Sequence, residues 1–425
     1  MSTIKEVLKD INVEPEVLEI NLLHKNVNSF VSAFKKALSE KTKEGQVFLG
    51  GSYAKNTLVN KKVYDVDVFI RLPKNKLNTK YIGALVKHVA NQFRYKISEV
   101  KGSRPYYRVK VNSRTVFEVV PALKISKPRD ADNVIDLSFF HVSYVKNKIN
   151  KNKRLAREIR LAKTFCASQG VYGAESYIRG FSGYALECLI IYYKTLENML
   201  KKFAFTKEKI VIDPEKHYRN AADAIYNMNE SKTQGPLVIV DPTWNERNVA
   251  AAVSYEAFAR LQMAAKAFIK KPSKIFFKEA DLDMDKFRNS AKVGEKYAKI
   301  IIETNKQNGD IAGTKLKKFS KYFVLNLQKV CSVRKWHFEY SGRKQAIIHI
   351  IAKPKTEIIQ TGPPTKMLKA AKAFKEEHKK IFEKSGKLYA KIPLSKDLDE
   401  LLYEFIKRED RIAKQMSITE IGLKD

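Results

Sequence analysis

A glycine pair followed by two spaced aspartates constrains the fold of this chain more than any other feature. The apolar segment QVFLGG (46–51) predicts a short buried strand, and the glycines at its end let a backbone come close to a ligand. VDVFIRL (66–72) predicts a second strand. Asp65 and Asp67 lie two residues apart, so both carboxylates point to the same side of that strand. Two such carboxylates repel each other unless a cation lies between them, and Mg²⁺ suits this position because it takes oxygen ligands.

A third acid lies in the middle of another apolar segment. TVFEVVPAL (115–123) predicts a strand rich in Val and Phe, with Glu118 near its centre. Burial of an unpaired carboxylate is costly, so this placement indicates a function. Beside Asp65 and Asp67, Glu118 would complete a two-metal site, in which one metal lowers the pKa of an attacking hydroxyl and the other stabilises a leaving pyrophosphate. The ordered set therefore predicts nucleotidyl transfer from a nucleoside triphosphate.

The pattern of apolar residues divides the chain into three parts. Strands and helices are mixed over 1–145, helices predominate over 146–270, and 271–425 mixes both again. The second part includes a long helix expected over 181–203. In the last part, WHFEY and QAIIHIIA flank SGRK, which predicts a hairpin, and a long basic helix is expected over 365–384. We therefore expect an α+β multidomain protein with these three domains.

The charge of the chain indicates a polyanionic partner. Lysine and arginine number 81 and aspartate and glutamate 46, which gives a formal net charge of +35. Nucleic acid is the first candidate partner and an anionic membrane surface is the second. A lysine-rich, solvated surface would give the same composition. Basic residues concentrate in 51–150 and 301–390, which favours two contact regions on one long partner.

Several classes of protein are excluded by the rest of the sequence. The first ten residues, MSTIKEVLKD, lack the apolar core of a signal peptide, and no apolar stretch is long enough to span a bilayer. The three cysteines, which form no CxxC pair, are Cys166, Cys188 and Cys331. This spacing argues against a zinc ribbon or a disulfide framework and fits a reducing compartment. We expect a cytoplasmic protein with no membrane partner.

Two longer segments of the sequence resemble one particular family of nucleotidyltransferases. RLAKTFCASQGVYGAESYIRGFSGYALECLI (160–190) and VDPTWNERNVAAAVS (240–254) resemble the archaeal-type (class I) CCA-adding enzymes, which are tRNA nucleotidyltransferases of the polymerase-β-like superfamily. The resemblance is tight over 46–280 and collinear beyond it, with IIQTGPP (358–364) as a marker. It implies a polymerase-β-like nucleotidyltransferase head with a mixed sheet, a mostly helical central domain, and an α+β C-terminal body and tail that binds tRNA.

The resemblance also implies a set of contacts with the nucleotide. Lys163 and Tyr172 match the triphosphate-binding lysine and tyrosine of the central domain, and Arg247 matches the arginine that reads the incoming base together with tRNA phosphates. Ser52 and Lys55 lie in the triphosphate-binding turn, where Ser52 opens a short helix with free N–H groups. The full set of expected nucleotide-binding residues is Gly51, Ser52, Lys55, Ser138, His141, Lys163, Tyr172 and Arg247.

The acids depart from the family pattern at two positions. Asp65 stands where the family commonly has glutamate, and Glu118 stands where it usually has aspartate. One position has lost a methylene and the other has gained one. Because the charge is kept at both, we expect metal binding to survive, and the effect on the rate stays open.

The resemblance predicts the activity as well. This family adds C, C and A to the 3′ end of tRNA from CTP and then ATP, without a nucleic-acid template. We expect an enzyme with two Mg²⁺ ions held by Asp65, Asp67 and Glu118 as its catalytic residues, and with tRNA, CTP and ATP as partners. A homodimer stays open. Two alternatives remain at this point: a poly(A)-adding or other RNA-terminal nucleotidyltransferase, and a non-catalytic RNA-binding protein on a nucleotidyltransferase scaffold.

Overall fold

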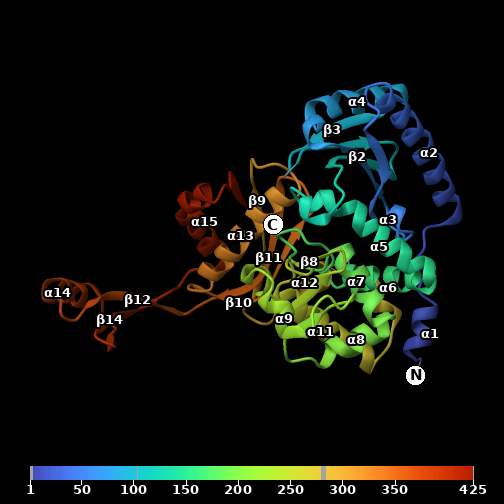
Figure 1. Cartoon of the computed structure of the whole chain (residues 1–425). Coiled ribbons are helices and arrows are strands. Elements are labelled where there is room, and N and C mark those ends of the chain that lie inside the picture. Colours follow the sequence, from blue (N-terminus) through green and yellow to red (C-terminus); the bar gives the residue numbers. More distant parts are fainter. Residues whose placement is uncertain (1–2, 103, 279–283, 425) are drawn as a thin grey trace. The chain divides into compact units, whose positions relative to one another are not determined.

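The chain forms two compact units, Met1–Ala280 and Asp281–Asp425, and its helices and strands are drawn in Figure 1. Each unit has hydrophobic clusters of its own. The computed structural model describes residues 3–102, 104–278 and 284–424. Within these described ranges, no helix is both long and apolar enough to cross a membrane.

The first unit begins with a five-stranded mixed sheet in the order β1-β2-β5-β4-β3. Strands β2 and β5 are parallel, and the other neighbouring pairs are antiparallel. Helices α2 (Val17–Ser39) and α4 (Thr79–Gln92) pack on one face, where Phe30, Phe34 and Phe117 belong to the same buried cluster. The strands are β1 (Gln46–Leu49), β2 (Tyr64–Leu72), β3 (Lys96–Val100), β4 (Tyr106–Lys110) and β5 (Thr115–Leu123).

The strands predicted from QVFLGG, VDVFIRL and TVFEVVPAL are confirmed as β1, β2 and β5. Strands β2 and β5 share one burial pattern, in which the first residues alternate and the last five are all buried. The apolar pattern did not predict β3. That strand lies at the edge of the sheet and exposes much of its surface, so its sequence carries no continuous apolar stripe.

Helices around a second core make up the rest of the first unit. The single helix expected over 181–203 is wrong. The chain takes a φ of 70° at Lys194, which ends α7, and the Thr195 side chain then accepts a hydrogen bond that caps α8. The helices are α1 (Ile4–Lys9), α3 (Gly51–Ala54), α5 (Ser138–Lys151), α6 (Arg154–Ser168), α7 (Gly183–Tyr193), α8 (Leu196–Phe205), α9 (Ala221–Tyr226), α10 (Glu230–Thr233) and α11 (Tyr255–Lys270). A small sheet contains β6 (Ile210–Ile212), β7 (Leu237–Asp241) and β8 (Trp244–Asn248).

The second unit holds two sheets. The larger one has the order β10-β11-β9-β15, and α13 and α15 share its buried cluster. The hairpin predicted around SGRK is confirmed as β10 and β11. The basic helix expected over 365–384 is wrong beyond Glu377, because residues 381–384 form a strand that pairs with β14 in the sheet β12-β14-β13. The elements are α12 (Met284–Asn289), β9 (Lys296–Glu303), α13 (Asp310–Leu327), β10 (Cys331–Tyr340), β11 (Gln345–Pro354), β12 (Glu357–Pro364), α14 (Leu368–Glu377), β13 (Ile381–Lys384), β14 (Lys387–Pro393), α15 (Leu398–Gln415) and β15 (Glu420–Lys424).

The division into three domains stays a prediction. Helix α5 runs across the predicted boundary at residue 145, and the two compact units divide at residue 280. The fold class of an α+β multidomain protein with a mixed sheet agrees with the element order and the sheets.

A buried ion pair secures the chain after β5. The Arg104 guanidinium donates to both carboxylate oxygens of Asp136, at 2.5 and 3.2 Å, and Asp136 also accepts the backbone N–H of Leu123 at 2.7 Å. The side chain of Asp136 is fully buried. Its loss would leave Arg104 as an uncompensated charge and the backbone donor without its acceptor.

We predict that Asp136→Ala lowers the free energy of unfolding by about 3–5 kcal/mol. The matched control is Asp132→Ala, because Asp132 forms an exposed ion pair with Lys74 whose loss should cost about 1 kcal/mol or less. Urea unfolding of both variants, followed by circular dichroism, measures the difference. Equal costs for the two variants would contradict this account of Asp136.

Candidate active site

Three carboxylates lie together on one face of the mixed sheet. Strands β2 and β5 are parallel neighbours, and their register places Asp67 opposite Glu118. Asp65 precedes Asp67 by two residues and so lies on the same face. Helices α2 and α4 cover the other face, so this face remains available to form a site. The parallel pairing therefore brings together acids that are more than fifty residues apart in the sequence.

The electrostatics show how closely these acids interact. Burial raises the pKa of Asp67 to about 6, against the opposing effect of Lys55. Burial, followed by the charges of Asp67 and Asp65, raises the pKa of Glu118 to about 7. A nearby positive charge would therefore stabilise the ionised form of both carboxyl groups.

Two basic side chains partly supply that charge. The Lys61 ammonium lies 2.8 Å from Asp65, and Arg108 on β4 lies 3.2 Å from both Asp65 and Glu118. Arg108 pairs directly across the strands with Glu118. The sequence analysis missed Arg108. The one feature that could have pointed to it is that it lies in the strand segment that precedes the segment with Glu118.

The donor set fits a divalent cation. Among the described residues, no three His, Cys, Asp or Glu side chains are already grouped closely enough to hold a metal ion. Asp65, Asp67 and Glu118 are nevertheless all carboxylates on one face, and carboxylate oxygens are the ligands that Mg²⁺ takes. A cation between them would relieve the mutual repulsion that contributes to the raised pKa of Glu118.

The glycine turn lies directly against these acids. Gly51 has a φ of +60°, and a Cβ atom placed there would come within 1.7 Å of Oδ2 of Asp67. Any other residue would therefore collide with the carboxylate and strain the backbone. Glycine at position 51 therefore allows the turn to lie against Asp67, and Ser52 is the residue that follows.

Two lysines meet on one buried glutamate beside this turn. The ammonium of Lys55 lies 2.6 Å from one carboxylate oxygen of Glu187, and that of Lys163 lies 2.8 Å from the other. Thr57 donates to Glu187 at 3.0 Å and accepts from Lys163 at 2.9 Å. Burial opposes the ionisation of Glu187, but the two ammonium groups overcome this effect and lower its pKa to about 2. Burial lowers the pKa of Lys163 to about 8, in spite of Glu187.

Tyr172 belongs to the same corner of the structure. A Cβ atom at Gly183, the first residue of α7, would lie 3.2 Å from the Tyr172 hydroxyl and 3.7 Å from Cε of Lys163. The fold therefore brings together three residues that the sequence analysis assigned to the triphosphate, namely Lys55, Lys163 and Tyr172. Glu187 holds two of them and was not predicted.

A second buried carboxylate organises the remaining predicted residues. Oδ2 of Asp241, at the end of β7, lies 3.0 Å from Nε2 of His141 and 2.7 Å from the guanidinium of Arg247. Tyr184 stacks on the His141 ring and donates to Oδ1 of Asp241. Burial opposes ionisation of Asp241, but His141 and Arg247 hold its pKa well below the usual range. Ser138 begins α5, one turn before His141.

Asp241 and Glu187 are acids in apolar elements, a feature that the sequence analysis used only to single out Glu118. Glu187 interrupts the apolar run of α7, and Asp241 ends the apolar strand LVIVD. Both side chains are fully buried. An acid within an apolar element needs a partner, and here the partners are the predicted functional residues themselves.

We predict that Glu187 makes the stability of the protein depend on pH. Its pKa is about 2 in the folded chain and about 4.3 in an unfolded one, so its contribution is complete above pH 5 and declines as the pH falls toward 2. The stability difference between the wild type and Glu187→Gln should therefore shrink by about 1–2 kcal/mol between pH 5 and pH 3. Urea unfolding at both pH values measures it. Glu208→Gln, at an exposed position, is the control, and a difference that does not change with pH would refute the ionised state of Glu187.

Two family descriptions match the chain. Residues 157–278 match the family described as tRNA nucleotidyltransferase, second domain. Residues 1–134 match the domain described as second messenger oligonucleotide or dinucleotide synthetase.

Curated relatives extend these matches over most of the chain. A CCA-adding enzyme of Nanoarchaeum equitans is 32% identical over 345 residues, which cover 81% of this chain and 82% of that protein. A CCA-adding enzyme of Pyrobaculum islandicum is 28% identical over 353 residues, which cover 83% and 79%. A crystal structure of the Cid1 poly(U) polymerase with Mg and 3′-dATP shares 13% identity at a TM-score of 0.50, and covers 65% of this chain and 98% of that one. The likeness to that structure confirms the predicted nucleotidyltransferase fold alone.

Proposed function

This chain belongs to the CCA-adding enzymes, and on that premise we propose that it adds C, C and A to the 3′ end of tRNA from CTP and ATP, without a template. The observation that supports this activity most directly is the shared face of Asp65, Asp67 and Glu118, next to a turn that requires Gly51. A non-catalytic RNA-binding protein would not need three acids to converge beside such a turn.

The three carboxylates account for the chemistry. Asp65, Asp67 and Glu118 would hold two Mg²⁺ ions, which when bound supply a lower pKa for the attacking hydroxyl and charge compensation for the leaving group. The 3′ oxygen of the tRNA forms a bond to the α-phosphorus, and the bond between that phosphorus and the bridging oxygen breaks to release pyrophosphate. We propose that Glu118 also accepts the proton of the 3′ hydroxyl, as the carboxylate beside the metal that activates this hydroxyl.

The buried lysines account for binding of the triphosphate. Lys55 and Lys163 bring two positive charges to the single negative charge of Glu187, so their cluster keeps a net positive charge. We propose that the triphosphate binds at this cluster, with Tyr172 and Ser52 at its border. Glu187 orients both ammonium groups before the ligand arrives, which reduces the entropy lost on binding.

The arrangement around Asp241 accounts for selection of the base. Arg247 keeps part of its side chain exposed, while Asp241 fixes the position of its guanidinium at 2.7 Å. We propose that Arg247 reads the incoming base and that His141 and Ser138 contact the nucleotide. Asp241 serves as a positioning residue, because it is buried and reaches the ligand only through Arg247 and His141.

The second unit supplies a basic surface for the body of the tRNA. Ala371 and Phe374 are buried on one side of α14, while six lysines of the segment are exposed. These lysines, which we call the tail lysines, are Lys366, Lys369, Lys372, Lys375, Lys379 and Lys380. We propose that they neutralise tRNA phosphates, and that the divisions 1–145, 146–270 and 271–425 correspond to catalytic, central and tRNA-binding domains. The three cysteines are free and buried, which agrees with a reducing cytoplasm.

We predict that Asp67→Ala and Asp67→Asn reduce incorporation of labelled CTP into tRNA that lacks CCA by on the order of a thousandfold or more. The affinity for tRNA should stay within about twofold of the wild type, since the carboxylate binds metal rather than RNA. The control is Asp130→Asn, at an exposed position of the same unit. Sequencing of the wild-type products separates three added nucleotides from an open-ended tail. Continued CTP addition by the Asp67 variants would refute the site.

We predict that reversing the charge of Lys366, Lys369 and Lys372 to glutamate raises the Kd for tRNA by about tenfold or more at low salt. The slope of log Kd against log salt should flatten by about 2–3, because three phosphate contacts are lost. The KM for CTP at saturating tRNA should not change. The matched control reverses Lys407, Arg411 and Lys414, which are exposed on α15 of the same unit. An equal loss of affinity in both triple variants would show that the effect is one of net charge rather than of α14.

A further inference from the structure

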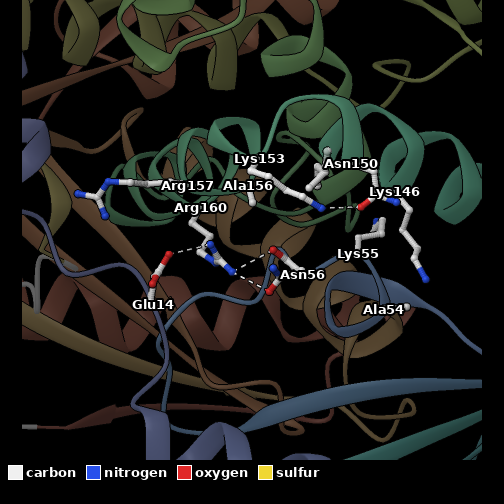
Figure 2. A pocket seen from close by; sticks show the side chains of 11 residues that line it. Glu14, Ala54, Lys55, Asn56, Lys146, Asn150, Lys153, Ala156, Arg157 and Arg160 are labelled. Atoms are coloured by element: carbon white, nitrogen blue, oxygen red, sulfur yellow. Dashed lines mark hydrogen bonds and ion pairs between the residues drawn. The ribbon is translucent and has the colours of Figure 1, made fainter.

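A groove lies beside α3, and the three carboxylates are not part of its lining. One part of it is a cavity of about 360 Å³ between α3, the end of α5 and the start of α6 (Figure 2). The other part is a cavity of about 410 Å³ between α2, β1, α3 and α5. Ala54 and Lys146 line both cavities, so the two adjoin, and we call them together the α3 groove. Among the described residues that line it, none is Asp65, Asp67 or Glu118.

The first part of the groove has an excess of positive charge. Arg160 is neutralised by Glu14 at 3.0 Å, and Lys55 is paired with Glu187. Within the described part of the chain, Lys146 and Lys153 form no ion pair with a carboxylate. Lys153 instead donates to the neutral side chain of Asn150 at 2.9 Å, as Figure 2 shows.

Arg157 adds a third positive charge. Its guanidinium donates to backbone carbonyls near the end of α1, among them that of Leu8 at 2.8 Å, and these acceptors carry no net charge. Lys146, Lys153 and Arg157 therefore leave about three positive charges without a matching carboxylate. Lysine and arginine charges gathered around a cavity of this kind fit a phosphate group.

The second part of the groove has an aromatic lining. Phe48, Tyr53 and Phe139 are each partly exposed there. Phe48 and Phe139 meet edge to face at 5.5 Å, and the Tyr53 hydroxyl is held at 2.6 Å by Nδ1 of His24. Partly exposed aromatic rings that are fixed in this way provide a surface on which a nucleobase can stack.

We propose that the α3 groove binds one nucleotide unit, with its phosphate against Lys146 and Lys153 and its base against Phe48, Tyr53 and Phe139. The groove is distinct from the catalytic carboxylates, since Gly51 lies against Asp67 while Tyr53 and Ala54 line the groove. Its first part adjoins the proposed triphosphate cluster, because Lys55 lines it as well. A free nucleotide and an unpaired nucleotide of RNA share this chemistry. The test distinguishes these two sources.

The experiment is photolabelling of the full chain with two probes, followed by identification of the labelled residues by mass spectrometry. The probes are 8-azido-ATP and a single-stranded RNA that carries 4-thiouridine. We expect label on Tyr53 or Phe139, reduced at least tenfold in the double variant Lys146→Glu/Lys153→Glu. The matched control is Lys151→Glu/Arg154→Glu, which makes the same charge change on the same two helices at exposed positions outside the groove lining. It should label as the wild type does.

Each outcome decides the proposal. Label from 8-azido-ATP alone supports a free nucleotide as the occupant, and label from the RNA alone supports an RNA nucleotide. Absence of label at Tyr53 and Phe139 with both probes, or label that persists in the Lys146/Lys153 variant, overturns the site. If inorganic phosphate competes as well as CMP does, the aromatic contact with the base is refuted. CTP addition at saturating tRNA should be unchanged in the Lys146/Lys153 variant, which separates this test from the proposed catalytic function.

Discussion

The buried carboxylate of Glu187 holds the first unit together at its functional centre. Its two oxygens accept from Lys55, which follows the glycine turn, and from Lys163 on α6. Such a cluster is costly to bury unless each charge is matched, and the second lysine leaves it with a surplus of one positive charge. The same contacts that attach the sheet to the helices therefore create the positively charged cluster at which we propose that the triphosphate binds.

A few residues away, the excess charge is negative rather than positive. Asp67 and Glu118 face each other across β2 and β5, and both carry pKa values raised by burial. The fold tolerates this arrangement because Lys61 and Arg108 lie beside the acids. The structure thus keeps excess negative charge next to excess positive charge. The negative charge suits metal ions, and the positive charge suits the phosphates of a triphosphate.

Local pattern predicted the strands of the first unit well and failed where tertiary pairing decided the outcome. Short apolar segments rich in Val and Phe identified β2 and β5, because the last five residues of each strand are buried. It failed for residues 381–384, whose helical pattern was overridden by pairing with β14, and for the helix that breaks at Lys194. The positive φ at Lys194 and the pairing of residues 381–384 with β14 leave no periodic trace in the sequence.

The candidate site divides in the same way. The sequence by itself predicted which groups carry the chemistry, because an unpaired acid within an apolar strand is costly to bury unless it has a function. It could not show that Glu187 binds Lys55 and Lys163, or that Asp241 fixes His141 and Arg247. These partners are separated by 6 to 132 residues, and only the packing of the strands and helices brings them within hydrogen-bond distance. Residue type decided what each group can do, and tertiary structure decided which partner sets its charge and position.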